Sequence, residues 1–191
     1  MKITAESFLK DVESHELNIL RDDGVYRHIF VKQPNTVCES FNIITTPGYL
    51  IYYGDMGSFV FTRVQDMFNF FRRKELSINE GYWAEKLEAA DRHGGYEKFS
   101  FEQFKENLMS YCETDEQKQW MESELEFVGD DEHSAIEFCH DFDNNNEAGV
   151  DLSDFWECDN NKYTHRFIWC CYALVWTIQQ YDLLNTESKA A

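Results

Sequence analysis

Residues 24–63, GVYRHIFVKQPNTVCESFNIITTPGYLIYYGDMGSFVFTR, restrict the fold of this 191-residue chain more than any other stretch. Runs rich in β-branched and aromatic residues are separated by the turn sequences QPN, TPG and GDMG. This pattern predicts four strands, near residues 25–31, 38–45, 49–53 and 59–62. Connections this short leave no room for a crossover helix, so we expect neighbouring strands to pair antiparallel in a meander.

Helical patterns flank this predicted sheet. A short N-terminal helix capped by Thr4 is expected within residues 3–20, and the later helices are expected near residues 64–73, 82–92, 100–112, 114–128, 130–143 and 163–181. Strands followed by helices indicate an α+β fold: a small antiparallel β-meander of about four strands packed against several helices, with a mostly helical, acidic C-terminal half. We expect a single domain over residues 1–191, with a sub-boundary near residue 75.

The longest apolar run, FIWCCYALVWTI, covers residues 167–178. It is too short to span a bilayer and is typical of a buried helix. The six cysteines form no CxxC motif, and no signal peptide opens the chain, so we expect reduced thiols in a cytoplasmic protein.

The formal net charge of −19 is unevenly distributed. Residues 1–74 hold nine basic and nine acidic residues, whereas residues 113–159 hold 17 acids and one base, Lys118. A negative field of this kind repels nucleic acids and anionic membranes and attracts cationic partners. The alternative is that the acids only keep an aromatic-rich protein soluble.

Two metal-site templates fail within the Cys/His/Asp-rich segment. An EF-hand loop read from Asp143 would use Asp143, Asn145, Glu147, Asp151 and Asp154. However, it has Ala148 where the loop needs glycine and Asp154 where it needs a bidentate glutamate. A zinc site would draw on His133, Cys139, His140, Cys158 and His165, which lack the spacing of structural zinc motifs. The sequence therefore predicts no bound metal and no other cofactor.

Catalytic motifs are also missing, since the chain has no GxSxG, HExxH or Walker sequence. GDMGS, residues 54–58, lies between predicted strands and indicates a hairpin turn rather than a phosphate loop. Asp91, Arg92 and His93 could form an acid–base group, but they also resemble an ordinary helix C-terminus. No catalytic residue is predicted.

The acidic region can be interpreted as an imitation of the phosphates of a nucleic acid, whose charge density is high. Direct nucleic-acid binding is not expected, because the aromatic residues are interleaved with acids rather than bases. Arg63, Arg72, Arg73 and Lys74 form the only basic cluster, and they can be the end of a helix. Phe155 and Trp156 are expected to anchor the acidic loop to the core. The predicted partner-binding acids are Glu113, Asp115, Glu116, Glu122, Glu124, Glu126, Asp130, Asp131, Glu132, Glu137, Asp141, Asp143, Glu147, Asp151 and Asp154.

Four stretches resemble a family of small proteins of tailed bacteriophages and prophages that has no assigned reaction. They are GVYRHI (24–29), TTPGYLIYYGDMGSFVFTRVQDMFNFFR (45–72), INEGYWAEKLEAADRHGG (78–95) and YTHRFIWCCYALVWTI (163–178). The resemblance is weakest over residues 113–159. It implies a phage accessory protein in the cytoplasm of a bacterial host cell.

By analogy, we expect an anti-defence inhibitor, with an anti-CRISPR role first and an anti-restriction role next. Such a protein would dock its acidic surface on a basic, nucleic-acid-handling host complex, by nucleic-acid mimicry or by subunit displacement. Two alternatives remain open. One is a metal-dependent or acid–base enzyme acting on a small molecule, and the other is a structural or regulatory phage protein.

Overall fold

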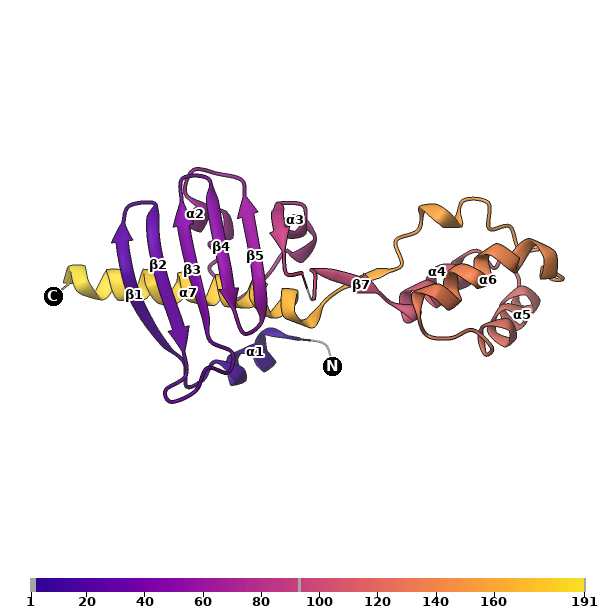
Figure 1. The fold of residues 1–191 in the computed structure, drawn as a ribbon, viewed down its shortest axis with the longest axis horizontal. Coiled ribbons are helices and arrows are strands. Elements are labelled where there is room, and N and C mark those ends of the chain that lie inside the picture. The colour runs from indigo at the N-terminus through magenta and orange to yellow at the C-terminus, as the bar shows by residue number, and fades with distance from the viewer. Residues whose placement is uncertain (1–2, 93, 191) are drawn as a thin grey trace. The chain divides into compact units, whose positions relative to one another are not determined.

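The chain forms two compact units, each with a hydrophobic core of its own (Figure 1). The computed structural model describes residues 3–92 and 94–190, with the backbone alone for residues 143–144 and 187–190. We call the unit of residues 1–96 and 163–191 the body, and the unit of residues 97–162 the insert. The limits of the two units lie at residues 96/97 and 162/163.

The body contains a six-stranded antiparallel sheet, which confirms the predicted α+β class and the meander. Its strands follow one another in chain order: β1 (Glu16–Asp23), β2 (Tyr26–Lys32), β3 (Phe41–Thr46), β4 (Tyr49–Gly54), β5 (Gly57–Thr62) and β6 (Leu87–Ala90). The sheet thus has six strands rather than the four expected, because a strand was missed at each edge.

Both missed strands lie in segments that were expected to be helical. The helix α1 (Ala5–Asp11) is capped by Thr4 as predicted, but it ends early and β1 follows it. The helix α3 (Glu80–Ala84) is short, and β6 follows it where a longer helix was expected. Strand pairing overrides the helix propensity of LEAA in β6, where Ala89 pairs with Val60 of β5.

One face of the sheet is buried against helix α7 (His165–Ala190), which runs across the strands in Figure 1. Side chains alternate across a strand, so every second residue of β2 to β5 points to this face. The ring of Phe59 lies 5.4 Å from that of Phe167, and the ring of Phe41 lies 5.6 Å from that of Trp169. These contacts place the apolar run of α7 in the body core, as predicted. None of the helices in residues 3–92 and 94–190 is long and apolar enough to cross a membrane.

The GDMG sequence forms the hairpin turn between β4 and β5, as predicted. Gly54 pairs with Gly57, whose φ of +109° favours glycine. Gly54 also packs directly against Ser40, because an added Cβ would lie 2.2 Å from the Ser40 carbonyl oxygen. The turn is therefore explained by local geometry, without a phosphate ligand.

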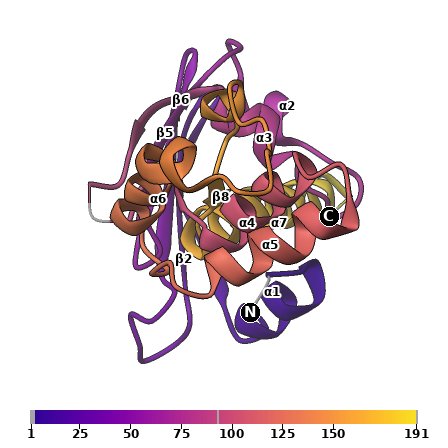
Figure 2. The same cartoon turned by 90° about the vertical axis from the view of Figure 1, so that its right-hand side faces the viewer.

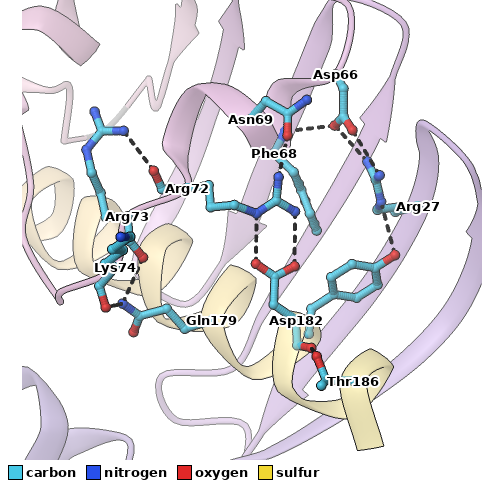
Figure 3. Close-up of polar contacts among 11 residues, drawn as sticks. Arg27, Asp66, Phe68, Asn69, Arg72, Arg73, Lys74, Gln179, Asp182 and Thr186 are labelled. Atoms are coloured by element: carbon cyan, nitrogen blue, oxygen red, sulfur yellow. Dashed lines mark hydrogen bonds and ion pairs between the residues drawn. The ribbon is translucent and has the colours of Figure 1, made fainter. Parts of the chain in front are cut away.

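Two arginines of the body join the sheet to helix α2 (Met67–Phe71) and α2 to α7 (Figure 3). Arg27 on β2 donates two hydrogen bonds to Asp66, at 2.9 and 3.1 Å. Arg72, which follows α2, donates two to Asp182 of α7, at 2.7 and 3.0 Å. Part of the predicted basic cluster is thus engaged in structural ion pairs.

The insert is mostly helical, as expected for the acidic part of the chain. It comprises β7 (Glu97–Phe99), α4 (Phe101–Ser110), α5 (Asp115–Leu125), α6 (Glu132–Asn145), the 3₁₀ turn η1 (Phe155–Glu157) and all of β8 (Asn161–Tyr163) except its last residue, which belongs to the body. Both α5 and α6 contact α4, and Figure 2 gives a second view of these helices. Strand β7 pairs with β8, and Ser100 N–H donates to the Asn160 carbonyl at 2.8 Å.

Candidate protein-interaction site

The insert exposes nearly all of the acids that were predicted to bind a partner. Thirteen of these 15 side chains are exposed: Glu113, Asp115, Glu116, Glu122, Glu126, Asp130, Asp131, Glu132, Glu137, Asp141, Glu147, Asp151 and Asp154. Glu124 is half-buried, and the side chain of Asp143 lies outside the described residues. All 15 belong to one compact unit, which carries 20 acidic and four basic residues and a formal charge of −16.

Helix packing explains why the acids point outward. In α5, Met121 and Leu125 face the insert core, and the adjacent positions Glu122 and Glu126 are exposed. The start of α5 is stabilised by Thr114, which accepts a hydrogen bond from Gln117 N–H. The apolar positions thus determine which face of the helix presents charge.

The exposed acids of the insert have few ionic partners of their own. Within its described residues, the single such contact found is that of His133 with Glu137, at 3.3 Å, and it is an ion pair only when His133 is protonated. In the body, by contrast, Asp22, Asp23, Asp66 and Asp182 all lie within 4.0 Å of an arginine nitrogen. These body acids therefore form ion pairs with arginines, whereas most acids of the insert are exposed without an arginine or lysine partner.

Hydrogen bonding stabilises the ionised form of two of the exposed acids. The Ser134 hydroxyl and N–H both donate to Asp131, the cap of α6, and they lower the pKa of Asp131. The Ser153 N–H donates to Asp151 at 2.9 Å and lowers the pKa of that carboxyl group. Both carboxylates therefore carry their charge at neutral pH and below.

The surface of the insert has two hollows with acids around them. The larger, of about 840 Å³, is lined by α6 and the loop of residues 146–161, and Glu132, Asp151 and Asp159 are among its acids. The smaller, of about 310 Å³, is lined by parts of α5 and α6 together with Phe127. Neither hollow has a lysine or arginine among its lining residues.

The expected anchoring of the acidic loop by two aromatic residues is only half right. Phe155 is buried in the insert core, where its ring lies 5.6 Å from that of Phe104. Trp156 is 78% exposed and lines the larger hollow instead. The two side chains are neighbours in the short turn η1, and only one of them reaches the core.

The residues considered for zinc binding come together only in part. Cys139, His140 and Cys158 line the larger hollow, whereas His133 pairs with Glu137. In the part of the chain that the structure describes, no three His, Cys, Asp or Glu residues come close enough to hold a metal ion. The proposed calcium loop would begin at Asp143, but helix α6 continues to Asn145, so its first three positions are part of the helix.

The acid–base group of Asp91, Arg92 and His93 cannot be assembled from the structure, because His93 lies outside the described residues. Asp91 follows strand β6 rather than a helix, and its carboxylate accepts a hydrogen bond from Gly94 N–H at 3.2 Å. This hydrogen bond lies shortly before the start of the insert in the chain.

Comparisons of the chain with family models, curated proteins and solved structures give no match.

Proposed function

We propose that the chain is a phage or mobile-element anti-defence inhibitor, which docks the acidic insert on the nucleic-acid-binding groove of a host complex. A CRISPR effector is the leading target and a restriction enzyme the next. The observation that carries this proposal is that 13 of the predicted partner-binding acids are exposed on the insert, whose formal charge is −16. The resemblance of four stretches to phage proteins adds the suggestion of a bacterial host.

The charge of the insert is of the magnitude that such mimicry needs. Duplex DNA carries one negative charge per about 1.7 Å of axis, so 16 charges correspond to about 27 Å, or roughly eight base pairs. Unpaired like charges repel one another and destabilise a compact unit. Solubility would not require the acids to be concentrated on one unit, whereas binding to a cationic groove would neutralise them there.

Competition with nucleic acid is the proposed mechanism. Carboxylates of the insert would pair with the lysines and arginines that otherwise hold phosphates, and the groove could not bind both ligands. Because these contacts are electrostatic and solvent-exposed at their edges, affinity should fall steeply as salt rises.

The test is a displacement assay with purified components. Fluorescence anisotropy of a labelled duplex bound to a CRISPR effector, or to a restriction enzyme, is measured while the protein is added. We expect displacement at low salt and much weaker displacement at high salt. Absence of displacement from both classes of complex, or an affinity that does not change with salt, would contradict the proposal.

A matched pair of variants tests whether the acids of the insert, rather than those of the body, carry the binding. One carries four glutamate-to-glutamine changes on the insert, at Glu113, Glu116, Glu122 and Glu126. The control carries four at exposed glutamates of the body, at Glu13, Glu16, Glu75 and Glu88. At about 0.2–1 kcal/mol per exposed pair, the four changes together remove about 0.8–4 kcal/mol, so the insert variant should bind at least about fourfold more weakly, and the control should bind like the unchanged protein.

A further inference from the structure

The larger hollow of the insert has an apolar floor. Phe104, Phe142, Val150 and Phe155 line it, and all four are buried side chains of the insert core. Its volume of about 840 Å³ falls within the range of about 300–1,000 Å³ that ligand sites occupy. It therefore has room for more than one side chain of a ligand. We call it the insert cleft.

Acids and two exposed apolar side chains complete the insert cleft. Glu132, Asp151 and Asp159 line it and are exposed, and no lysine or arginine is among its lining residues. Ile136 is 49% exposed and Trp156 78% exposed, although both are large hydrophobic residues. The cleft thus combines an apolar surface with uncompensated negative charge.

We propose that the insert cleft receives an aromatic or long aliphatic side chain from a basic segment of the partner protein. The inference rests on the proposed function and specifies which part of the acidic surface binds a side chain of the target. Flanking arginines or lysines of that segment would pair with Glu132, Asp151 and Asp159. A guanidinium group could also stack on the exposed ring of Trp156.

Charge complementarity selects this occupant over a neutral ligand. A neutral apolar ligand would cover three carboxylates and strip them of water without supplying a partner, which is costly. A segment with an apolar anchor between cations fills the floor and neutralises the acids together. Interfaces concentrate their binding energy in such anchors, whereas exposed ion pairs contribute little each.

Three labelled hexapeptides test this occupant against the intact protein by fluorescence anisotropy: KRFFRK, KRAARK and EEFFEE. We expect KRFFRK to bind at least tenfold more tightly than KRAARK, and EEFFEE to show no binding. Equal affinities of the two basic peptides would overturn the inference. Tight binding of EEFFEE would also overturn it, because it would identify a purely apolar pocket.

Two variants of exposed residues locate the binding. Trp156→Ala and Ile136→Ser should each weaken KRFFRK at least fivefold, and Ile136→Ser should leave KRAARK unchanged. Phe127→Ala is the matched control, since Phe127 is an 89% exposed aromatic of the same unit that does not line the insert cleft. An equal loss in the control would refute the assignment to the cleft.

The two proposals fail in different ways. If KRFFRK and KRAARK bind equally and both weaken with salt, the cleft is not an anchor site, and the proposed function is unaffected. If the anchored peptide binds selectively but the protein displaces no duplex from either complex, the anti-defence function is wrong, and the cleft still recognises basic segments.

Discussion

Replacing Asp66 with alanine should destabilise the body by about 4 kcal/mol. The Arg27 side chain is only 9% exposed and donates hydrogen bonds to both carboxylate oxygens of Asp66, whose own side chain is 22% exposed. Removing one partner of a buried ion pair typically costs about 3–5 kcal/mol. We take about 3 kcal/mol, the lower end, because Asp22 remains 4.0 Å from the Arg27 guanidinium. Loss of the cap on α2, where Asp66 accepts from Phe68 N–H, adds about 1 kcal/mol.

Two further variants separate these contributions. Asp66→Asn keeps an acceptor for the cap and should cost about 3 kcal/mol. Arg27→Met combined with Asp66→Asn removes the buried cation as well, so the double variant should be more stable than Asp66→Asn alone. The coupling between the two sites should be about 2–3 kcal/mol.

The pH dependence has a defined sign. Burial raises the pKa of Asp66, but hydrogen bonds from Arg27 and from Phe68 N–H outweigh it, and the net pKa is lowered. Stability from Asp66 is therefore fully present above the ordinary aspartate pKa and is lost as the pH falls through the lower folded value. Asp66→Asn should lose this part of the acid dependence.

Urea unfolding, read by hydrogen exchange of amides in β2 to β5, measures the body separately from the insert. A cost below about 1 kcal/mol for Asp66→Asn would fall under the range for removing a partner of a buried ion pair. An unchanged acid dependence would refute the assigned pKa shift. Either result would mean that the Arg27 pair does not stabilise the body as argued.

Three other outcomes are expected. Gly54→Ala should cost more than about 2 kcal/mol of body stability in urea unfolding, because the added methyl would overlap the Ser40 carbonyl. Phe104→Ala should cost the insert about 3–5 kcal/mol, and hydrogen exchange should rise in the insert while the body stays protected. The exposed thiol of Cys38 should react with iodoacetamide in the native protein, whereas Cys170, whose pKa is raised by full burial, should react only after unfolding.

The central strands could be predicted from the sequence because each is rich in β-branched and aromatic residues and has turn residues at its ends. The edge strands could not, for two different reasons. Strand β1 is exposed along most of its length and is interrupted by a bulge near Ile19, so its alternation is weak. Strand β6 consists of LEAA, which favours a helix in isolation, and its conformation is imposed by pairing with β5.

The acidic surface was predictable because charged side chains are almost never buried without a partner. The insert cleft was not, since Phe104 and Val150 come together only when the helices pack. The exposure of Trp156, which lines the cleft, could have been inferred from the sequence but was not. Phe155 and Trp156 are adjacent, and two successive large side chains in a short turn seldom both face the core.

The position of the insert also affects the order in which the chain can fold. Helix α7 covers the apolar face of a sheet whose strands precede the insert, so the body core can close only after residues 97–162 have been made. The insert has a core of its own, and its ends are joined by the β7–β8 pair. If it folds first, the flexible loop between sheet and helix is shortened about eightfold, which lowers the entropy cost of closure by about 2 kcal/mol. Besides binding a partner, the acidic insert would then help the body to fold by holding the sheet and helix α7 close together.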